Sequence, residues 1–537
     1  MEISTLTRNV SQFARLLAVL GLACASSTSM AETPVVNNIQ TLLAGDGWPS
    51  DLFGRSVDVD ADTALIGASN ESYTGAAYLF TRDASGVWYE QAKLRAGDAA
   101  SDDLFGVSVS LDADTALIGA PNESRTGAAY IYTRNGSGEW SEQAKLLAGD
   151  ASRSDRFGHS VALTGDTAVI GAWEADSNGL INNGAAYVFT RDVTGAWSEQ
   201  AKLLASDAAS MDYFGQSVAV DGNTVLVGAE SESSNGLLRN GAAYVFTRDA
   251  SGAWSEQAKL LAVDRAAGDL FGRSVAIDGD TALIGAFAKD STGLENNGAA
   301  YVFTRSMSGE WAEQAKLLPS ETTSGDLFGS SVALDGDTAL IGAWGGYINA
   351  YVFERDAGGT WSEKARLLAI DAASEERYAE DVALSRATAI AGAATDPTFS
   401  PYEGAAYVFD LTPLIAPMEV AIDIKPGNRR NVMNPRSRGR FWLAILSDAE
   451  FDALQVDPAT VALGAGEASP DRYRVKDVNR DRLPDLMLRF RTPEVGLQCG
   501  DTEVDLSGEI YAGDSVIGLD KVKTVGCKKK PKKGKKK

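Results

Sequence analysis

Residues 269–286 read DLFGRSVAIDGDTALIGA, and close copies of this stretch recur along the chain. Three of these copies are DLFGRSVDVDADTALIGA at 51–68, DLFGVSVSLDADTALIGA at 103–120 and DLFGSSVALDGDTALIGA at 326–343. A self-similar stretch that returns at a near-constant spacing indicates a repeat architecture. We therefore interpret the fold from the repeat unit.

Each repeat unit contains four short apolar segments. In the unit that starts at residue 271, they are SVAI (274–277), ALIGA (282–286), GAAYVFTR (298–305) and WAEQAKLL (311–318). Short runs rich in β-branched and aromatic residues, separated by Gly, Asp, Asn and Ser, are typical of strands. Four strands in a unit of about 50 residues predict one blade of a β-propeller.

The number of units predicts seven blades. Phe-Gly pairs occur at 53–54, 105–106, 157–158, 214–215, 271–272 and 328–329, and Tyr378-Ala379 holds the seventh place. The seventh unit ends at GAAYVFDL (404–411) without a fourth segment, whereas IQTLLAGD (39–46) matches the end of the other units. The sequence thus predicts an all-β, seven-bladed propeller over 32–411, in which the N-terminal strand completes the last blade and few strand edges stay exposed.

The pattern FGxSVA…TALIGA…NGAAYVFTR…WxEQAKLLA resembles the FG-GAP repeat family, known from integrin-type seven-bladed propellers, over residues 39–411. The resemblance implies a calcium loop of the form DxDxDGxxD between the first two strands. Here Asp278 and Asp280 match its first two acids, but Ala282 stands at the third and already belongs to a strand. We therefore interpret the Asp-Gly pairs as tight hairpin turns.

A second set of acids precedes the Phe-Gly pairs: Asp51, Asp103, Asp155, Asp212, Asp269 and Asp326. One interpretation is a carboxylate that accepts backbone N–H groups in the turn between blades. The alternative is a functional ring of carboxylates on one face. Because a binding or catalytic site is usually unique, six copies favour the turn.

The loops between the second and third strands differ among blades. They have six residues in the first blade (69–74) but eleven in the third, fourth and fifth (173–183, 230–240 and 287–297). The long loops carry apolar tips at Leu180, Ile181, Leu237, Leu238 and Leu294. In the family that this chain resembles, these loops form a ligand-binding face. We predict that the tips contact a protein or glycan ligand, the alternative being that they pack on neighbouring loops.

A Pro-containing linker (412–418) precedes a non-repeating segment (419–527) that we predict to be a small β-sandwich. It resembles a module of many exported bacterial proteins that opens with IDIKPG. Its stretch DVNRDRLPD (477–485) has oxygen donors at the spacing of a calcium loop: Asp477, Asn479, Asp481, the Leu483 carbonyl and Asp485. Arg482 stands where such loops usually have Gly, so the alternative is an acidic turn without metal.

The N-terminus predicts export. Arg8 and Arg15 precede the apolar run LLAVLGLACA (16–25), and a small-x-small site ends at Ala31, so residues 1–31 read as a signal peptide. The run is too short to span a bilayer, and no other segment qualifies. We expect an extracellular, periplasmic or cell-surface protein, with lipid attachment at Cys24 as the alternative. In that setting, Cys499 and Cys527 are expected to form a disulfide.

The charge distribution constrains the partners. The formal net charge is −24, although the final ten residues, KKKPKKGKKK (528–537), are strongly basic. An acidic body repels nucleic-acid phosphate. The Lys-rich tail is too charged to fold, and it could contact anionic surface polymers or stay solvated.

The sequence contains few of the residues and motifs that are typical of enzyme active sites. The chain has one histidine, His159, which we interpret as variation within the repeat, because other residue types follow the remaining Phe-Gly pairs. No metalloprotease, nucleotide-binding or nucleophile motif is present. We expect a non-enzymatic binding or adhesion protein. The alternatives are a structural component of the cell surface or matrix, and a carboxylate-based polysaccharide hydrolase or lyase.

Overall fold

A computed structural model describes residues 33–48, 50–345, 349–356, 358–369, 376–395, 404–412, 414, 418–427, 431–448, 451–509 and 515–526. The described chain is built from β-strands, with three short 3₁₀ turns at η1 (Glu71–Tyr73), η2 (Glu123–Arg125) and η3 (Ala453–Gln455). The all-β prediction is confirmed. No helix among these residues is long and apolar enough to cross a membrane.

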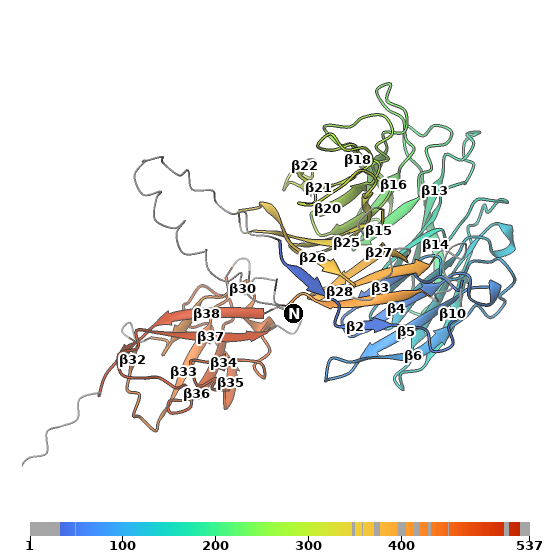
Figure 1. Ribbon diagram of the computed structural model, residues 1–537. Coiled ribbons are helices and arrows are strands. Elements are labelled where there is room, and N and C mark those ends of the chain that lie inside the picture. Colours follow the sequence, from blue (N-terminus) through green and yellow to red (C-terminus); the bar gives the residue numbers. More distant parts are fainter. Residues whose placement is uncertain are drawn as a thin grey trace, which may run out of the picture. The chain divides into compact units, whose positions relative to one another are not determined.

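Seven sheets follow one another along the chain as the blades of a propeller (Figure 1). Blade 1 contains β3 (Phe53–Asp60), β4 (Thr63–Ala68), β5 (Ala76–Arg82) and β6 (Trp88–Leu94). Blade 2 contains β7 (Val109–Asp112), β8 (Thr115–Ala120), β9 (Ala128–Arg134) and β10 (Trp140–Leu146). Blade 3 contains β11 (Ser160–Thr164), β12 (Thr167–Ala172), β13 (Ala185–Arg191) and β14 (Trp197–Leu203).

The remaining blades repeat this order. Blade 4 contains β15 (Ser217–Asp221), β16 (Thr224–Ala229), β17 (Ala242–Arg248) and β18 (Trp254–Leu260). Blade 5 contains β19 (Val275–Asp278), β20 (Thr281–Ala286), β21 (Ala299–Arg305) and β22 (Trp311–Leu317). Blade 6 contains β23 (Phe328–Asp335), β24 (Thr338–Ala343), β25 (Asn349–Arg355) and β26 (Trp361–Leu368). Blade 7 contains β27 (Glu376–Ser385), β28 (Thr388–Thr395) and β29 (Ala405–Asp410).

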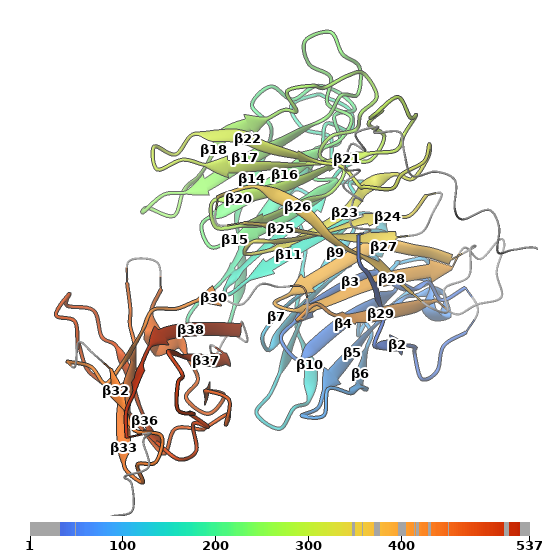
Figure 2. The same ribbon diagram turned by 60° about the vertical axis from the view of Figure 1, so that its left-hand side comes forward.

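The N-terminal strand β2 (Gln40–Leu42) is the fourth strand of blade 7, as predicted. It pairs antiparallel with β29, and the two strands lie side by side in Figure 2. Gln40 joins it to blade 1, because its side chain accepts from the Trp88 N–H at 2.9 Å and donates to the Trp88 carbonyl at 2.8 Å. The first strands of the blades contact one another in a complete cycle, β27 with β3 included.

A second N-terminal strand, β1 (Val35–Asn37), was not predicted. It pairs in parallel with β26 and makes blade 6 five-stranded. The two short strands therefore attach the N-terminus to two adjacent blades, because β1 extends blade 6 and β2 completes blade 7.

The repeated residues explain the packing between blades. The second strand, TALIGA in most copies, is buried along its whole length, because it is covered by both neighbouring blades. Phe271 of the Phe-Gly pair packs edge-on against Tyr301 and Phe303, with ring centroids 5.5 and 6.0 Å apart. Gly272 has φ +89°, and an added Cβ would lie 2.3 Å from the Ala242 carbonyl oxygen. Only glycine fits this position.

The segment after the propeller folds as a β-sandwich, as predicted. One sheet contains β30 (Met418–Glu419), β34 (Ala462–Leu463), β37 (Glu503–Glu509) and β38 (Ser515–Lys521). The other contains β31 (Ile422–Ile424), β33 (Arg440–Ile445), β35 (Arg472–Val475) and β36 (Leu486–Arg491), and β32 (Val432–Met433) pairs with β39 (Lys523–Thr524). Buried side chains of both sheets, such as Leu443 and Leu506, form one core.

Candidate functional site

The acids before the Phe-Gly pairs belong to the framework. Each is buried, and its carboxylate accepts the backbone N–H three residues earlier: Asp103 from Ala100 at 2.6 Å, and Asp155 from Ser152 at 2.7 Å. The turn interpretation is thereby confirmed. Burial raises the pKa of Asp212 to about 6, although the hydrogen bond from Ala209 opposes this shift.

The hairpin-turn acids also hold blades together. The first turn acid of one blade accepts a backbone N–H from the next blade, as Asp60 does from Ala113 and Asp221 from Gly279, both at 2.8 Å. The second turn acid pairs within its own blade, as Asp280 does with Arg305 Nε at 2.6 Å. The predicted tight hairpins are confirmed, and Ala282 lies inside β20.

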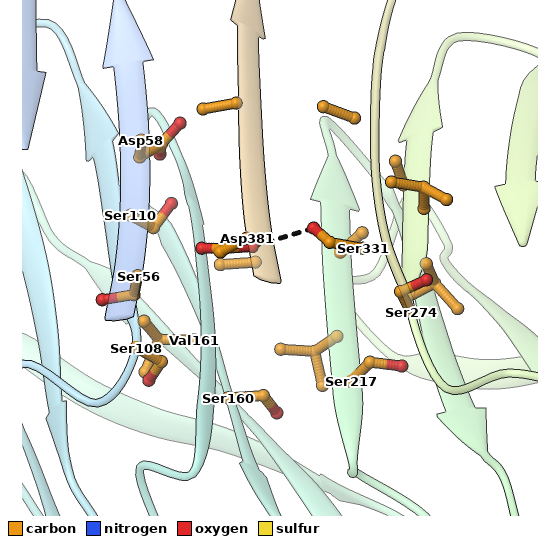
Figure 3. A pocket seen from close by; sticks show the side chains of 18 of the residues that line it. Ser56, Asp58, Ser108, Ser110, Ser160, Val161, Ser217, Ser274, Ser331 and Asp381 are labelled. Atoms are coloured by element: carbon orange, nitrogen blue, oxygen red, sulfur yellow. Dashed lines mark hydrogen bonds between the residues drawn. The ribbon is translucent and has the colours of Figure 1, made fainter. Parts of the chain in front are cut away.

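A cavity of about 410 Å³ runs between the first strands of all seven blades. Serines that line this channel donate from Oγ to a glycine carbonyl of the next blade, as Ser217 does to Gly272 at 2.9 Å. Figure 3 shows Ser56, Ser108, Ser160, Ser217 and Ser274, which all make this bond. These serines of the channel wall therefore serve mainly to join neighbouring blades.

Besides these serines, two carboxylates, Asp58 and Asp381, lie on one side of the channel (Figure 3). Asp381 of blade 7 accepts from the Val57 N–H at 2.8 Å and from Ser331 Oγ at 2.9 Å. Asp58 of blade 1 accepts from the N–H groups of Val59 and Leu111, at 2.8 and 2.7 Å. Burial, with smaller contributions from Asp381 and Asp60, raises the pKa of Asp58 to about 7.

The blades differ most at one end of the channel. The residue directly after each Phe-Gly pair, or its equivalent, lines the cavity there: Arg55, Val107, His159, Gln216, Arg273, Ser330 and Glu380. The residue directly after each second strand, or its equivalent within β28 of blade 7, also varies: Ser69, Pro121, Trp173, Glu230, Phe287, Trp344 and Ala394. The latter residues are large or charged only in blades 3 to 6.

The varied residues of blades 3, 4 and 5 occupy matching positions, and contacts join several of them. Trp173 lies against His159 and Tyr213, with ring centroids 5.4 and 4.8 Å apart. Arg273 Nη1 lies 3.6 Å from Glu230 Oε2, and its guanidinium is 5.8 Å from the centre of the Phe287 ring. We call the following six residues the mouth arc: His159, Trp173, Gln216, Glu230, Arg273 and Phe287.

Three polar atoms of the mouth arc are buried without a hydrogen-bond partner among the described residues. They are Trp173 Nε1, Gln216 Oε1 and Glu230 Oε2. Gln216 is only 8% exposed. Buried polar atoms are hydrogen-bonded in most proteins, to protein, water or a bound molecule. Blades 3 and 4 thus offer one donor and two acceptors, of which Glu230 Oε2 also lies 3.6 Å from Arg273 Nη1. Similar buried atoms occur in other blades, such as Trp197 Nε1 and Trp254 Nε1.

His159 is neutral at physiological pH. Its burial, and next the positive charges of Arg273, Arg55 and Arg156, lower its pKa to about 3. It was not predicted as a site residue. The sequence signal that could have indicated it is the variation of residue type directly after Phe-Gly, in copies that are otherwise nearly identical.

The predicted apolar loop tips divide into two classes. Leu180, Leu237 and Leu294 are half-buried, and the N–H of each donates to the carbonyl of the serine three residues earlier, at 2.9–3.0 Å. Ile181 and Leu238 are 59% and 72% exposed. The Ile181 carbonyl accepts from the Met211 N–H of the next blade at 2.8 Å. Two of the five tips thus remain open to a partner, and their ligand contact stays a prediction.

The predicted calcium donors of the sandwich do not all converge. Asp485 is fully buried and accepts from the N–H groups of Ser447 and Val478, at 3.0 and 2.7 Å. Asp477 accepts from two backbone N–H groups of its own loop, and Asn479 donates to Asp481 at 2.7 Å.

The exposed Leu483 donates its N–H to Asp481 at 2.8 Å. Arg482 has φ +80°, the conformation for which such loops usually use glycine. The residues that the structure describes contain no group of three or more His, Cys, Asp or Glu side chains arranged to hold a metal. Calcium binding stays a prediction.

The predicted disulfide and the chain ends are only partly within the described residues. Cys499 is described, but Cys527 lies outside the described residues, so the Cys499–Cys527 pairing stays a prediction. The predicted signal peptide with Cys24, and the Lys-rich tail, also lie outside them.

The comparison with solved structures gives little information about the function of this chain. A crystal structure from Bacteroides uniformis, provisionally assigned as a 6-phosphogluconolactonase, has 11% sequence identity and a TM-score of 0.40. The match covers 59% of this chain and 85% of that protein. So low a TM-score supports no conclusion about this chain. No curated protein matches the sequence.

The comparison with protein-family models is more informative. The FG-GAP repeat model matches seven times, at residues 36–80, 88–132, 140–189, 197–246, 254–303, 311–353 and 361–409. These matches span more than half of the chain and include the first two strands of all seven blades. With seven blades of repeated framework residues, the chain belongs to the FG-GAP repeat family.

Proposed function

We propose that this protein is an exported, non-enzymatic binding or adhesion protein that holds a protein or glycan ligand at the mouth arc and the adjacent long loops. FG-GAP propellers commonly serve in binding or adhesion. One observation carries the proposal: the residues shared by the blades make structural hydrogen bonds, whereas the varied residues gather at one end of the channel.

The chemistry of the mouth arc favours a glycan. Small-molecule sites combine aromatic surface with a few placed polar groups in cavities of about 300–1,000 Å³. Trp173 and Phe287 supply half-buried aromatic surface, and the channel of about 410 Å³ falls in that range. Gln216, Glu230 and Arg273 supply the planar donors and acceptors that sugar hydroxyls need.

The long loops extend the same end of the propeller and could contact a larger ligand. Each long loop begins at Trp173, Glu230 or Phe287, and its last residues lie beside the Phe-Gly pair of the next blade. The exposed Ile181 and Leu238 belong to these loops. A glycan unit at the mouth arc and a protein or longer glycan over the loops are therefore compatible.

The channel carboxylates do not favour the hydrolase or lyase. Asp58 and Asp381 accept hydrogen bonds from the backbone of adjacent blades, which is a structural role. A general acid and base must instead reach a substrate. The structural alternative, a matrix component without a ligand, gives no role to the buried Trp173 Nε1 and Gln216 Oε1 of the mouth arc.

A screen of the purified chain distinguishes the three functions. The chain is applied to immobilised oligosaccharides and to cell-surface protein extracts, and released sugars are measured by mass spectrometry. We expect saturable binding without release of products. Released products would replace the proposal by the hydrolase or lyase, and no binding to any sample would favour the structural role.

A further inference from the structure

One face of the C-terminal sandwich carries five arginines. In β33 and β36, Phe441, Leu443, Leu488 and Phe490 point into the core, so the residues between them point outward. The register of β35 with β36 places Arg472 and Arg474 on the same outward side. The outward arginines are Arg440, Arg472, Arg474, Arg489 and Arg491, on the strands drawn in orange in Figure 1. We call this set, together with Trp442, the arginine face.

The register of the sheet places like charges directly opposite each other. Arg440 pairs with Arg491, and Arg472 pairs with Arg489. Opposed like charges destabilise a sheet. Stacking offsets part of this cost, because the Arg474 and Arg489 guanidinium groups lie 4.3 and 5.7 Å from the centre of the Trp442 ring. The arrangement orders the guanidinium groups on one surface.

The acids on this face are too few to neutralise it. Asp471 accepts from Arg440 Nε and Arg489 Nε, both at 2.6 Å, and lies 3.8 Å from Arg491. Asp423 of β31 lies opposite Ala444 and is the second acid in register with the face. Glu494 is a third acid, because its Oε1 lies 3.5 Å from Arg491 Nη1. Five arginines against these three acids leave a surplus of two positive charges.

Two of the arginines are available for a partner. No ion pair forms to Arg472 or Arg474 within the described residues, and both side chains are exposed. Arg438, which is also exposed, precedes β33 and adds one more positive charge. This basic surface contrasts with a whole-chain charge of −24.

We propose that the arginine face binds an acidic polysaccharide through its carboxylate or sulfate groups. A guanidinium group presents two parallel N–H donors to such a group, so ordered arginines suit a repeated anion. Adjacent strands lie about 4.8 Å apart, and alternate residues of a strand about 7 Å apart, which spaces the charges for a chain-like ligand. Nucleic acid fits less well, because the acidic remainder of the chain repels a long phosphate backbone.

The test measures binding of the full chain to polygalacturonate, a carboxylated polysaccharide, by biolayer interferometry at low and high salt. The double variant Arg472→Ser/Arg474→Ser removes the two arginines without an ion pair. We expect roughly fivefold weaker affinity for each lost arginine, and weaker binding at high salt. The matched control Arg153→Ser/Arg386→Ser removes two exposed arginines of the propeller and should bind like the parent.

Two further arms make the outcome decisive. The variant Arg472→Lys/Arg474→Lys keeps the positive charge but loses the paired N–H donors. Its affinity for polygalacturonate should lie between those of the parent and the serine variant. A chain that ends at Cys527 lacks the basic tail and should retain most of the binding. Equal loss in the control variant, loss caused only by removing the tail, or stronger binding to single-stranded DNA or to phosphatidylserine vesicles would overturn the proposal.

Discussion

The indole ring of Trp173 packs on the imidazole ring of His159, with centroids 5.4 Å apart and planes tilted by 47°. Trp173 follows the second strand of blade 3, and His159 follows its Phe-Gly pair. In blade 2 the same positions hold Pro121 and Val107. In blade 5 they hold Phe287 and Arg273, whose guanidinium lies 5.8 Å from the ring centre. The chemistry at these two positions therefore differs from blade to blade within a framework that is repeated seven times.

The first prediction concerns His159, the single histidine of the chain. Its pKa is lowered to about 3, first by burial, so its imidazole should stay neutral between pH 8 and 5. Because the unfolded chain binds a proton near pH 6.5, this residue contributes stability above that pH, and the contribution is lost as pH falls toward 3. NMR of the one histidine Cε1–H signal checks this. A titration midpoint near 6.5 would contradict the buried position.

The second prediction concerns the closure of the ring by β2. Leu42 is 1% exposed and lies in the core with Phe53 and Val408, so Leu42→Ala should lower the unfolding free energy by about 2–5 kcal/mol. Its neighbour Leu43 is 54% exposed, and Leu43→Ala should change stability by less than about 0.5 kcal/mol. Urea unfolding of both variants checks this, and equal effects would disprove the closure.

The third prediction concerns Asp58, whose pKa is raised from 3.8 to about 7 mainly by burial. Between these values the folded chain keeps a proton that the unfolded chain has released, so stability should fall as pH rises from about 4 to about 7. Asp58→Asn should flatten this dependence without abolishing it, because burial also raises the pKa of Asp381. The measurement is the difference in Tm between pH 5 and pH 8, and an unchanged difference would argue against a buried Asp58.

The fourth prediction concerns the loop tips. Ile181→Ser/Leu238→Ser changes only exposed side chains, so the unfolding free energy should stay within about 0.5 kcal/mol of the parent per site. If the ligand extends over the loops, its affinity should drop several-fold. The exposed Val193 and Met307 of other loops provide the control pair as serine variants. Unchanged affinity in the loop-tip variant would restrict the site to the mouth arc.

The repeat made most of the fold predictable. Phe-Gly pairs, Trp-initiated strands and the spare segment at 39–46 gave the blades, their number and the closure, because each feature recurs for one physical reason. The strand β1 was missed, because VVN at 35–37 is too short to give a periodic signal. Its partner β26 lies more than 300 residues away.

The site was harder to predict, because its residues come from different blades. Glu230 of blade 4 and Arg273 of blade 5, for example, meet only where these two blades pack against each other. The loop tips attracted attention as unexpected apolar residues, yet the structure turns three of them partly inward. His159 was dismissed as variation within the repeat, although that variation is concentrated at the channel.

Binding to an oligosaccharide array by three forms of the protein tests the mouth arc most directly: the parent, a double variant of the arc and a matched control. The double variant Trp173→Ala/Gln216→Ala removes one aromatic surface and one buried acceptor without a partner. The control Trp254→Ala/Gln143→Ala changes the same residue types on outer strands of the blades. We predict that the affinity of the arc variant for the oligosaccharide is at least tenfold lower than that of the parent, and that the control binds with the affinity of the parent. Equal binding by all three forms, with both variants folded, would contradict it.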